Sequence, residues 1–115
     1  MLAGHYTNRS EFIRDMIRER LVEAEWAGDA EVVGTITLVY DHHSRHLTDR
    51  LTDLQHHHHG AVLATTHVHL DAHRCAEMIL LRGPAAEIRE IADLLRRQKG
   101  VLHASLSVGS TGKTL

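Results

Sequence analysis

Residues 61–82 read AVLATTHVHLDAHRCAEMILLR, and this stretch decides the fold. Its first ten residues, 61–70, are rich in β-branched side chains and predict a strand, and residues 75–82 predict a second strand. The four residues Asp71–Arg74 between them are enough for a turn but too few for a crossover connection. The sequence therefore predicts two neighbouring antiparallel strands in the middle of the chain.

The segments on either side of this hairpin complete a known order of elements. Leu47, Leu51 and Leu54 recur at helical spacing, and a second helix is expected to start after Pro84 and to be capped by Gly100. From Glu31 onward the predicted elements are strand 31–40, helix 45–56, strand 61–70, strand 75–82, helix 85–99 and strand 101–108. The order β-α-β-β-α-β is that of the ferredoxin-like fold, an α+β architecture with both helices on one face of a four-stranded sheet. An uncovered apolar sheet face favours oligomerisation.

One further helix is predicted ahead of this unit. Residues 8–27 carry apolar side chains at helical spacing, with Asn8 or Ser10 able to cap the start and Gly28 ending the helix. The tail that follows Gly109 is expected to be loose.

Composition narrows the possible functions and points to metal. The net charge of −2 gives no overall basic field of the kind that attracts nucleic acid. No apolar run is long enough to span a bilayer, and a single cysteine cannot form an intrachain disulfide, which suits a cytoplasmic protein. The outlier is histidine, with twelve residues in 115. Because histidine is the commonest metal ligand, this bias is the first clue to function.

Three donors on the central hairpin are expected to converge. His67 and His69 lie two apart on a strand and so leave the same face, and Cys75 opens the next strand close to His69. Imidazoles with a thiolate suit late first-row metals; copper and nickel favour tetragonal sites, whereas zinc favours a tetrahedron. The alternative is that the histidines are merely exposed and Cys75 is a small buried hydrophobe. The combination of His67, His69 and Cys75 in a histidine-rich chain favours the metal site.

The run of four histidines at 56–59 is open to other interpretations. It could be the remnant of a purification tag or a nonspecific metal-binding tract. Only one or two of its imidazoles could point at any one site. The histidines with no assigned role are expected to be exposed, with weak extra metal sites possible at excess metal: His42, His43, His46, His57, His58, His59, His73 and His103.

Together the segments QHHHH (55–59) and THVH (66–69), with Cys75 and Glu77, closely resemble the NikR nickel-responsive regulators. The resemblance runs from about Tyr6 to the last strand. It implies a ferredoxin-like, ACT-like nickel domain that forms a homotetramer and binds one square-planar Ni²⁺ per subunit.

The implied nickel ligands are His67, His69 and Cys75 of one chain, with His56 donated by a neighbouring subunit. Tyr40, Gln55 and Glu77 match positions close to the site and are implied to support the ligands.

The segment NRSEFIRDMIR (8–18) resembles the second helix of a ribbon-helix-helix DNA-binding domain. The resemblance places Asn8, Arg9 and Ser10 at the helix end that faces a DNA phosphate. It also matches Glu11 and Asp15 to acidic positions that can hold a cation between domains. The alternative for these two carboxylates is a solvated acidic face.

The residues ahead of this helix, Met1–His5, are too few for the ribbon strand and first helix of such a domain. The predicted organisation is therefore a partial ribbon-helix-helix domain at 1–28, a nickel-binding and tetramerisation domain at 31–109, and a loose tail at 110–115. Operator DNA is expected as a partner only where the reading strand is present, because base contacts specify sequence whereas phosphate contacts position the protein.

These patterns leave three possible functions, which experiments can tell apart. The resemblance implies a cytoplasmic repressor of nickel-uptake genes that responds to nickel. The alternative is a nickel-binding module, such as a buffer or chaperone, without a DNA function. An enzyme that uses Cys75 as nucleophile and His69 as base is disfavoured, because no third orienting group or oxyanion site is evident.

Overall fold

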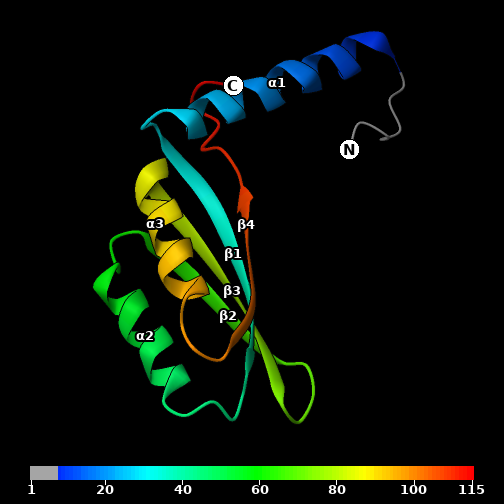
Figure 1. The fold of residues 1–115 in the computed structure, drawn as a ribbon. Coiled ribbons are helices and arrows are strands. Elements are labelled where there is room, and N and C mark those ends of the chain that lie inside the picture. The colour runs from blue at the N-terminus through cyan, green and yellow to red at the C-terminus, as the bar shows by residue number, and fades with distance from the viewer. Residues whose placement is uncertain (1–7) are drawn as a thin grey trace.

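The computed structural model describes residues 8–115. Part of the sequence interpretation rests on Met1–His5 and Tyr6, which lie outside that range. A long helix projects from one end of a sheet, and two shorter helices lie on one face of it (Figure 1). The elements are α1 (Arg9–Ala27), β1 (Glu31–Asp41), α2 (Leu47–His57), β2 (Val62–His69), β3 (Arg74–Pro84), α3 (Ala85–Arg96) and β4 (Val101–Val108).

The sheet has the strand order β2-β3-β1-β4, and every neighbouring pair is antiparallel. The predicted ferredoxin-like βαββαβ order is therefore confirmed. All six predicted elements of this unit are present, with ends that differ by up to three residues.

The two central strands alternate between a buried and an open face. On β1 the side chains of Val32, Ile36, Leu38 and Tyr40 are buried. On β3 the buried positions begin with Cys75 and recur at every second residue. This period of two follows from the pleat and sends both sets of side chains toward the helices.

Helices α2 and α3 cover that face because each carries an apolar stripe. Leu47 and Leu51 of α2 are buried, as are Ile88, Ile91 and Leu95 of α3. The predicted helix periodicity is thus confirmed in the core.

The opposite face of the sheet carries exposed apolar side chains. Val68, Met78 and Leu80 are 43%, 45% and 36% exposed, although each lies within a strand. Exposure of this kind on a sheet face is typical of a surface that contacts another molecule.

Helix α1 joins the rest of the domain through its last turn. Asn8 caps its start by accepting a hydrogen bond from the backbone N–H of Glu11 at 2.9 Å, and Gly28 follows its end, as predicted. Trp26 is buried in the core, whereas Ile13 and Ile17 in the first half are 51% and 54% exposed.

The predicted end of α3 is wrong by three residues. The helix stops at Arg96 and is capped by Arg97, whose backbone N–H bonds the carbonyl of Asp93. Gly100 lies in the turn that follows, with a φ of 99°, and a Cβ there would lie 2.3 Å from the Ser44 hydroxyl oxygen. Gly100 is thus needed for turn conformation and close approach, not as a helix cap.

Candidate metal centre

Strand register places the predicted ligands at one end of the sheet. His69 pairs directly with Cys75 across the β2–β3 ladder, and His67 pairs with Glu77. On the other side of β3, Cys75 pairs with Tyr40 of β1. Side chains directly opposite each other in a ladder share one face, so these residues are held together by the backbone.

The thiol of Cys75 is the centre of this group. Its side chain is fully buried, and its Sγ lies 3.3 Å from Nδ1 of His69 and 3.4 Å from Nδ1 of His42. The ligand atoms of His42, His69 and Cys75 all lie within 4.8 Å of one another. Two imidazole nitrogens and a sulfur this close suit a late first-row metal.

His42 is the member of this group that sequence reasoning left without a role. It follows β1 directly, and its backbone N–H donates to the carbonyl of His73 at 2.7 Å, which holds its loop against the β2–β3 turn. One signal could have found it. The ferredoxin-like order puts the first strand beside the third, so a residue just after 31–40 lies near the start of 75–82.

His67 lies beside the group but is not part of the three-residue set. Its Nε2 lies 3.2 Å from the Tyr40 hydroxyl, and its ring centre is 5.2 Å from that of His69. Burial, aided by the negative charges of Glu77 and Cys75, raises the pKa of Tyr40 to about 12. The hydroxyl therefore stays protonated and can donate to His67.

A second polar chain connects α2 to the same end of the sheet. The Gln55 side-chain amide donates to the buried carboxylate of Glu77 at 2.5 Å, and Thr65 donates to the Gln55 carbonyl oxygen at 2.8 Å. Gln55 and Glu77 thus contact each other. His56, the next residue of α2, is exposed and does not join the group around Cys75 in the part of the chain that the structure describes. It lines a surface hollow of about 310 Å³ with Gln55 and Glu77.

Electrostatics favour a cation next to the thiol. Burial, together with the nearby negative charge of Asp71, raises the pKa of Cys75, so the metal-free thiol keeps its proton at neutral pH. A metal cation reverses this preference because it stabilises the thiolate directly. The donor set therefore fits a thiolate-binding metal such as nickel, and His42, His69 and Cys75 are placed to hold it.

The predicted DNA-facing residues lie at the far end of the molecule. Asn8 caps α1, and Arg9 and Ser10 follow it as exposed residues. Glu11 and Asp15 are half-buried in the first turns of the same helix.

The fold and these donors define a candidate metal-binding domain of the ferredoxin-like class. A solved structure from Thermotoga maritima, of an uncharacterised protein, has the same fold with a TM-score of 0.61 and 13% identity, covering 68% of this chain and 96% of that one. The family profile described as the NikR C-terminal nickel-binding domain matches residues 33–108.

Relatives by sequence extend over nearly the whole chain. A Geobacter sulfurreducens protein named "Putative nickel-responsive regulator" is 56% identical over 111 residues, which is 96% of this chain and 80% of the relative. A protein of the same name from Nitratidesulfovibrio vulgaris is 50% identical with the same coverage. The chain belongs to the NikR family of nickel-responsive regulators. In the described part of the chain, no helix combines the length and apolarity that crossing a membrane requires.

Proposed function

We propose that this protein is a cytoplasmic, nickel-responsive transcriptional regulator that represses nickel-uptake genes. The observation that carries the proposal is the buried Cys75 thiol, flanked by imidazole nitrogens at 3.3 and 3.4 Å, within a domain whose family binds nickel. A regulator needs such a site because the sensed metal must be selected by its ligands. No catalytic role is assigned to Cys75.

The proposed nickel ligands are His67, His69 and Cys75 of one chain and the partner subunit's His56, with one Ni²⁺ per subunit of a homotetramer. Three features support this set. His67 and His69 lie on one face with ring centres 5.2 Å apart. His56 is exposed and free of the group formed within one chain. The open sheet face carries apolar side chains that another copy would cover.

Mixed assembly of two variants tests the shared ligand. Alone, His56→Ala and Cys75→Ala chains each lack a complete site and should bind nickel weakly. Mixed oligomers should regain some tight sites, because one chain supplies His56 and the other the remaining ligands. His57→Ala, also exposed at the end of α2, is the matched control and should bind as the unchanged chain does. Mixed oligomers that recover no tight site would place all the ligands in one chain.

A comparison of His42→Ala with His67→Ala decides between the two imidazoles next to His69. The proposed set predicts that His67→Ala lowers nickel affinity and removes square-planar geometry, whereas His42→Ala leaves the geometry unchanged. Loss of the thiolate-to-nickel absorption band in His42→Ala alone would assign the ligand to His42 instead.

Operator DNA is the proposed macromolecular partner where the reading strand is present, with Asn8, Arg9 and Ser10 toward a phosphate. The N-terminus of α1 is well formed, with Asn8 as its cap, and free N–H groups at such an end attract anions. The cation proposed for Glu11 and Asp15 would lie between this helix and the nickel domain.

Mobility shifts at fixed salt test the DNA function in a chain that carries the reading strand. Duplexes from upstream of its own gene and of neighbouring transport genes are compared with scrambled duplexes, with and without nickel. A nickel-dependent preference for one genomic duplex is the expected result. Tight nickel binding without any such preference would favour the alternative, a nickel buffer or chaperone.

A further inference from the structure

We propose that residues 109–115 (the tail) form a strap that closes over the end of α1 when Lys113 enters a neighbouring cavity and pairs with Glu25. The strap ties the last turn of α1 to the sheet, so α1 moves against the sheet only when this pair breaks. Figure 1 shows the tail next to α1, after the end of β4. The proposal does not depend on the nickel function.

The tail is already attached to the domain at two points. Gly109 donates its backbone N–H to the Val33 carbonyl of β1 at 2.8 Å, and its own carbonyl accepts the indole N–H of Trp26 at 2.8 Å. Further along, the Thr114 hydroxyl donates to Oε2 of Glu25 at 2.8 Å. Because Glu25 and Trp26 are neighbours in α1, both attachments hold the same turn of that helix.

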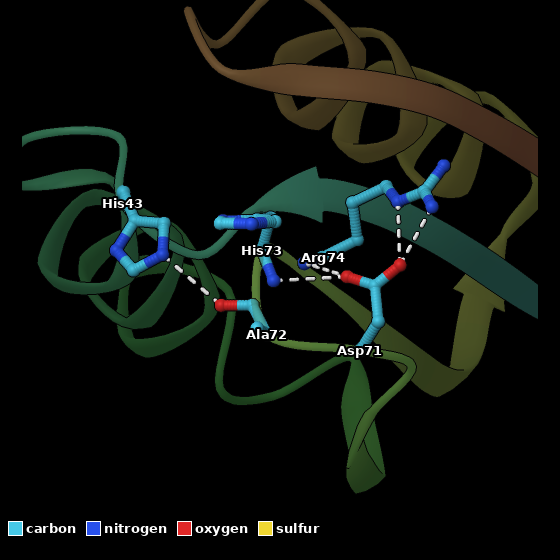
Figure 2. A network of polar contacts seen from close by, with 5 residues as sticks. All are labelled: His43, Asp71, Ala72, His73 and Arg74. Carbon is cyan, nitrogen blue, oxygen red and sulfur yellow. Dashed lines mark hydrogen bonds and ion pairs between the residues drawn. The ribbon is translucent and has the colours of Figure 1, made fainter.

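Glu25 has a hydrogen-bonding need that this arrangement does not meet. The residue is 8% exposed, and its Oε1 is the one buried side-chain oxygen or nitrogen without a hydrogen-bond partner in residues 8–115. Asp71 is a contrast: although exposed, its two oxygens accept from the Arg74 side chain and the backbone N–H of His73 (Figure 2). A buried carboxylate oxygen without a donor costs free energy, so a donor that can reach Oε1 is favoured.

A cavity beside Glu25 gives such a donor room to enter. Its volume is about 590 Å³, and it lies between the end of α1, the start of β1 and the tail. One water takes up about 30 Å³, so the space is large enough for a side chain. The charged residues that line the cavity are Glu25, Glu31, Arg82 and Lys113.

Lys113 is the lining cation that is available to Glu25. The Nε of Arg82 is paired with Oε1 of Glu31 at 2.6 Å, whereas none of the ion pairs within residues 8–115 includes Lys113. Lys113 directly precedes Thr114, which is already bonded to Glu25, and its four-carbon stem is flexible. Its ammonium can therefore swing into the cavity and donate to Oε1, as a charge-assisted hydrogen bond.

Amine labelling reports the position of Lys113 directly. Lys99 and Lys113 are the two lysines of the chain, and Lys99 is exposed, so it serves as the internal reference. A trace of acetic anhydride is added to the folded protein, and mass spectrometry gives the relative acetylation rates. Glu25→Gln keeps the size of the side chain but removes its charge. Glu23→Gln, an exposed position on the same helix, is the matched control.

In the unchanged chain, Lys113 should be acetylated about tenfold more slowly than Lys99, because a hydrogen bond to a charged group shifts a population by about that factor or more. Glu25→Gln should bring the two rates together, whereas Glu23→Gln should leave the difference in place. Equal rates in the unchanged chain, or slow labelling of Lys113 that persists in Glu25→Gln, would overturn the proposal.

Hydrogen exchange of Lys113→Gln tests the closure without altering the buried carboxylate. Lys113 is exposed, so this substitution leaves the core intact. The backbone N–H of Gly109, which is bonded to Val33, should exchange about tenfold faster in this variant because the strap opens more often. Lys99→Gln is the matched control and should exchange as the unchanged chain does. Equal exchange at Gly109 in both variants would show that Lys113 does not close the strap.

Discussion

Replacing Trp26 by alanine tests whether α1 is firmly joined to the metal-binding domain. Trp26 is 2% exposed, its indole N–H donates to the carbonyl of Gly109 at 2.8 Å, and Arg89 stacks on its ring at 5.4 Å. The Arg89 guanidinium also donates to the Trp26 carbonyl at 2.8 Å. The first half of the helix offers no comparable burial. The join therefore lies in the last turns of α1, where Trp26 is the most deeply buried side chain and Val22 and Glu25 add smaller contacts.

The expected loss follows from the size of the buried ring. Removing a buried tryptophan side chain costs about 3–5 kcal/mol in transfer and cavity terms. A chain of this length has a total stability of roughly 6–17 kcal/mol. Trp26→Ala should therefore still fold, with its unfolding midpoint lowered by about 15 °C.

Two further variants distinguish the loss of Trp26 packing from a general destabilisation of helix α1. Trp26→Phe keeps most of the ring but leaves the Gly109 carbonyl without its partner, so it should cost about 1–2 kcal/mol. Ile17→Ala, on the exposed part of α1, should change stability by less than about 0.5 kcal/mol.

Urea unfolding followed by far-ultraviolet circular dichroism gives these values. The variants are compared at equal protein concentration because the proposed assembly would add stability. Fluorescence is unsuitable because Trp26 is the only tryptophan. A loss below about 1 kcal/mol in Trp26→Ala would refute the docking of α1 through this side chain.

Three other predictions concern the site, the turn after α3 and the open sheet face. Nickel affinity should keep rising to unusually high pH, because burial raises the pKa of Cys75 and binding must release its proton. A competition titration that is flat with pH would contradict a ligand set that contains Cys75. Thermal melting should show that Gly100→Ala destabilises the fold by about 1–3 kcal/mol, because the new Cβ would lie 2.3 Å from the Ser44 hydroxyl oxygen. Gly60→Ala is the control and should be nearly neutral, because its Cβ would meet no atom within 4 Å. Met78→Asp should shift the protein toward smaller oligomers in light scattering, and an unchanged mass would place the interface elsewhere.

Local patterns in the sequence were enough to predict the fold. The hairpin of 61–82 needed only two β-rich runs and a short turn, and the helices needed only apolar spacing. The end of α3 was missed because Gly100 suggested a cap. Its actual role depends on how closely Ser44 approaches, a contact between segments far apart in the chain.

The candidate site was predictable where its residues are neighbours in one hairpin. His69 and Cys75 pair directly across β2 and β3, so their contact can be predicted from their spacing on either side of a short turn. The predicted strand order already placed the residues after β1 near Cys75, but His42 was missed because its exact approach depends on the bond from its N–H to the His73 carbonyl. The assignment of His56 to a partner subunit stays a prediction, since a single chain leaves it exposed.

The position of the site limits how nickel can act on α1. Glu31 opens β1 close to the end of α1, whereas Tyr40, nine residues later, pairs with Cys75. At about 3.3 Å per residue, the two ends of this stretch lie roughly 30 Å apart. Helix α1 projects from that far end of the sheet (Figure 1), so a metal at Cys75 cannot touch the start of α1 in the same chain. Because β1 is hydrogen-bonded on both sides, an effect of nickel on Asn8–Ser10 has to pass through the packed sheet or through contacts between copies.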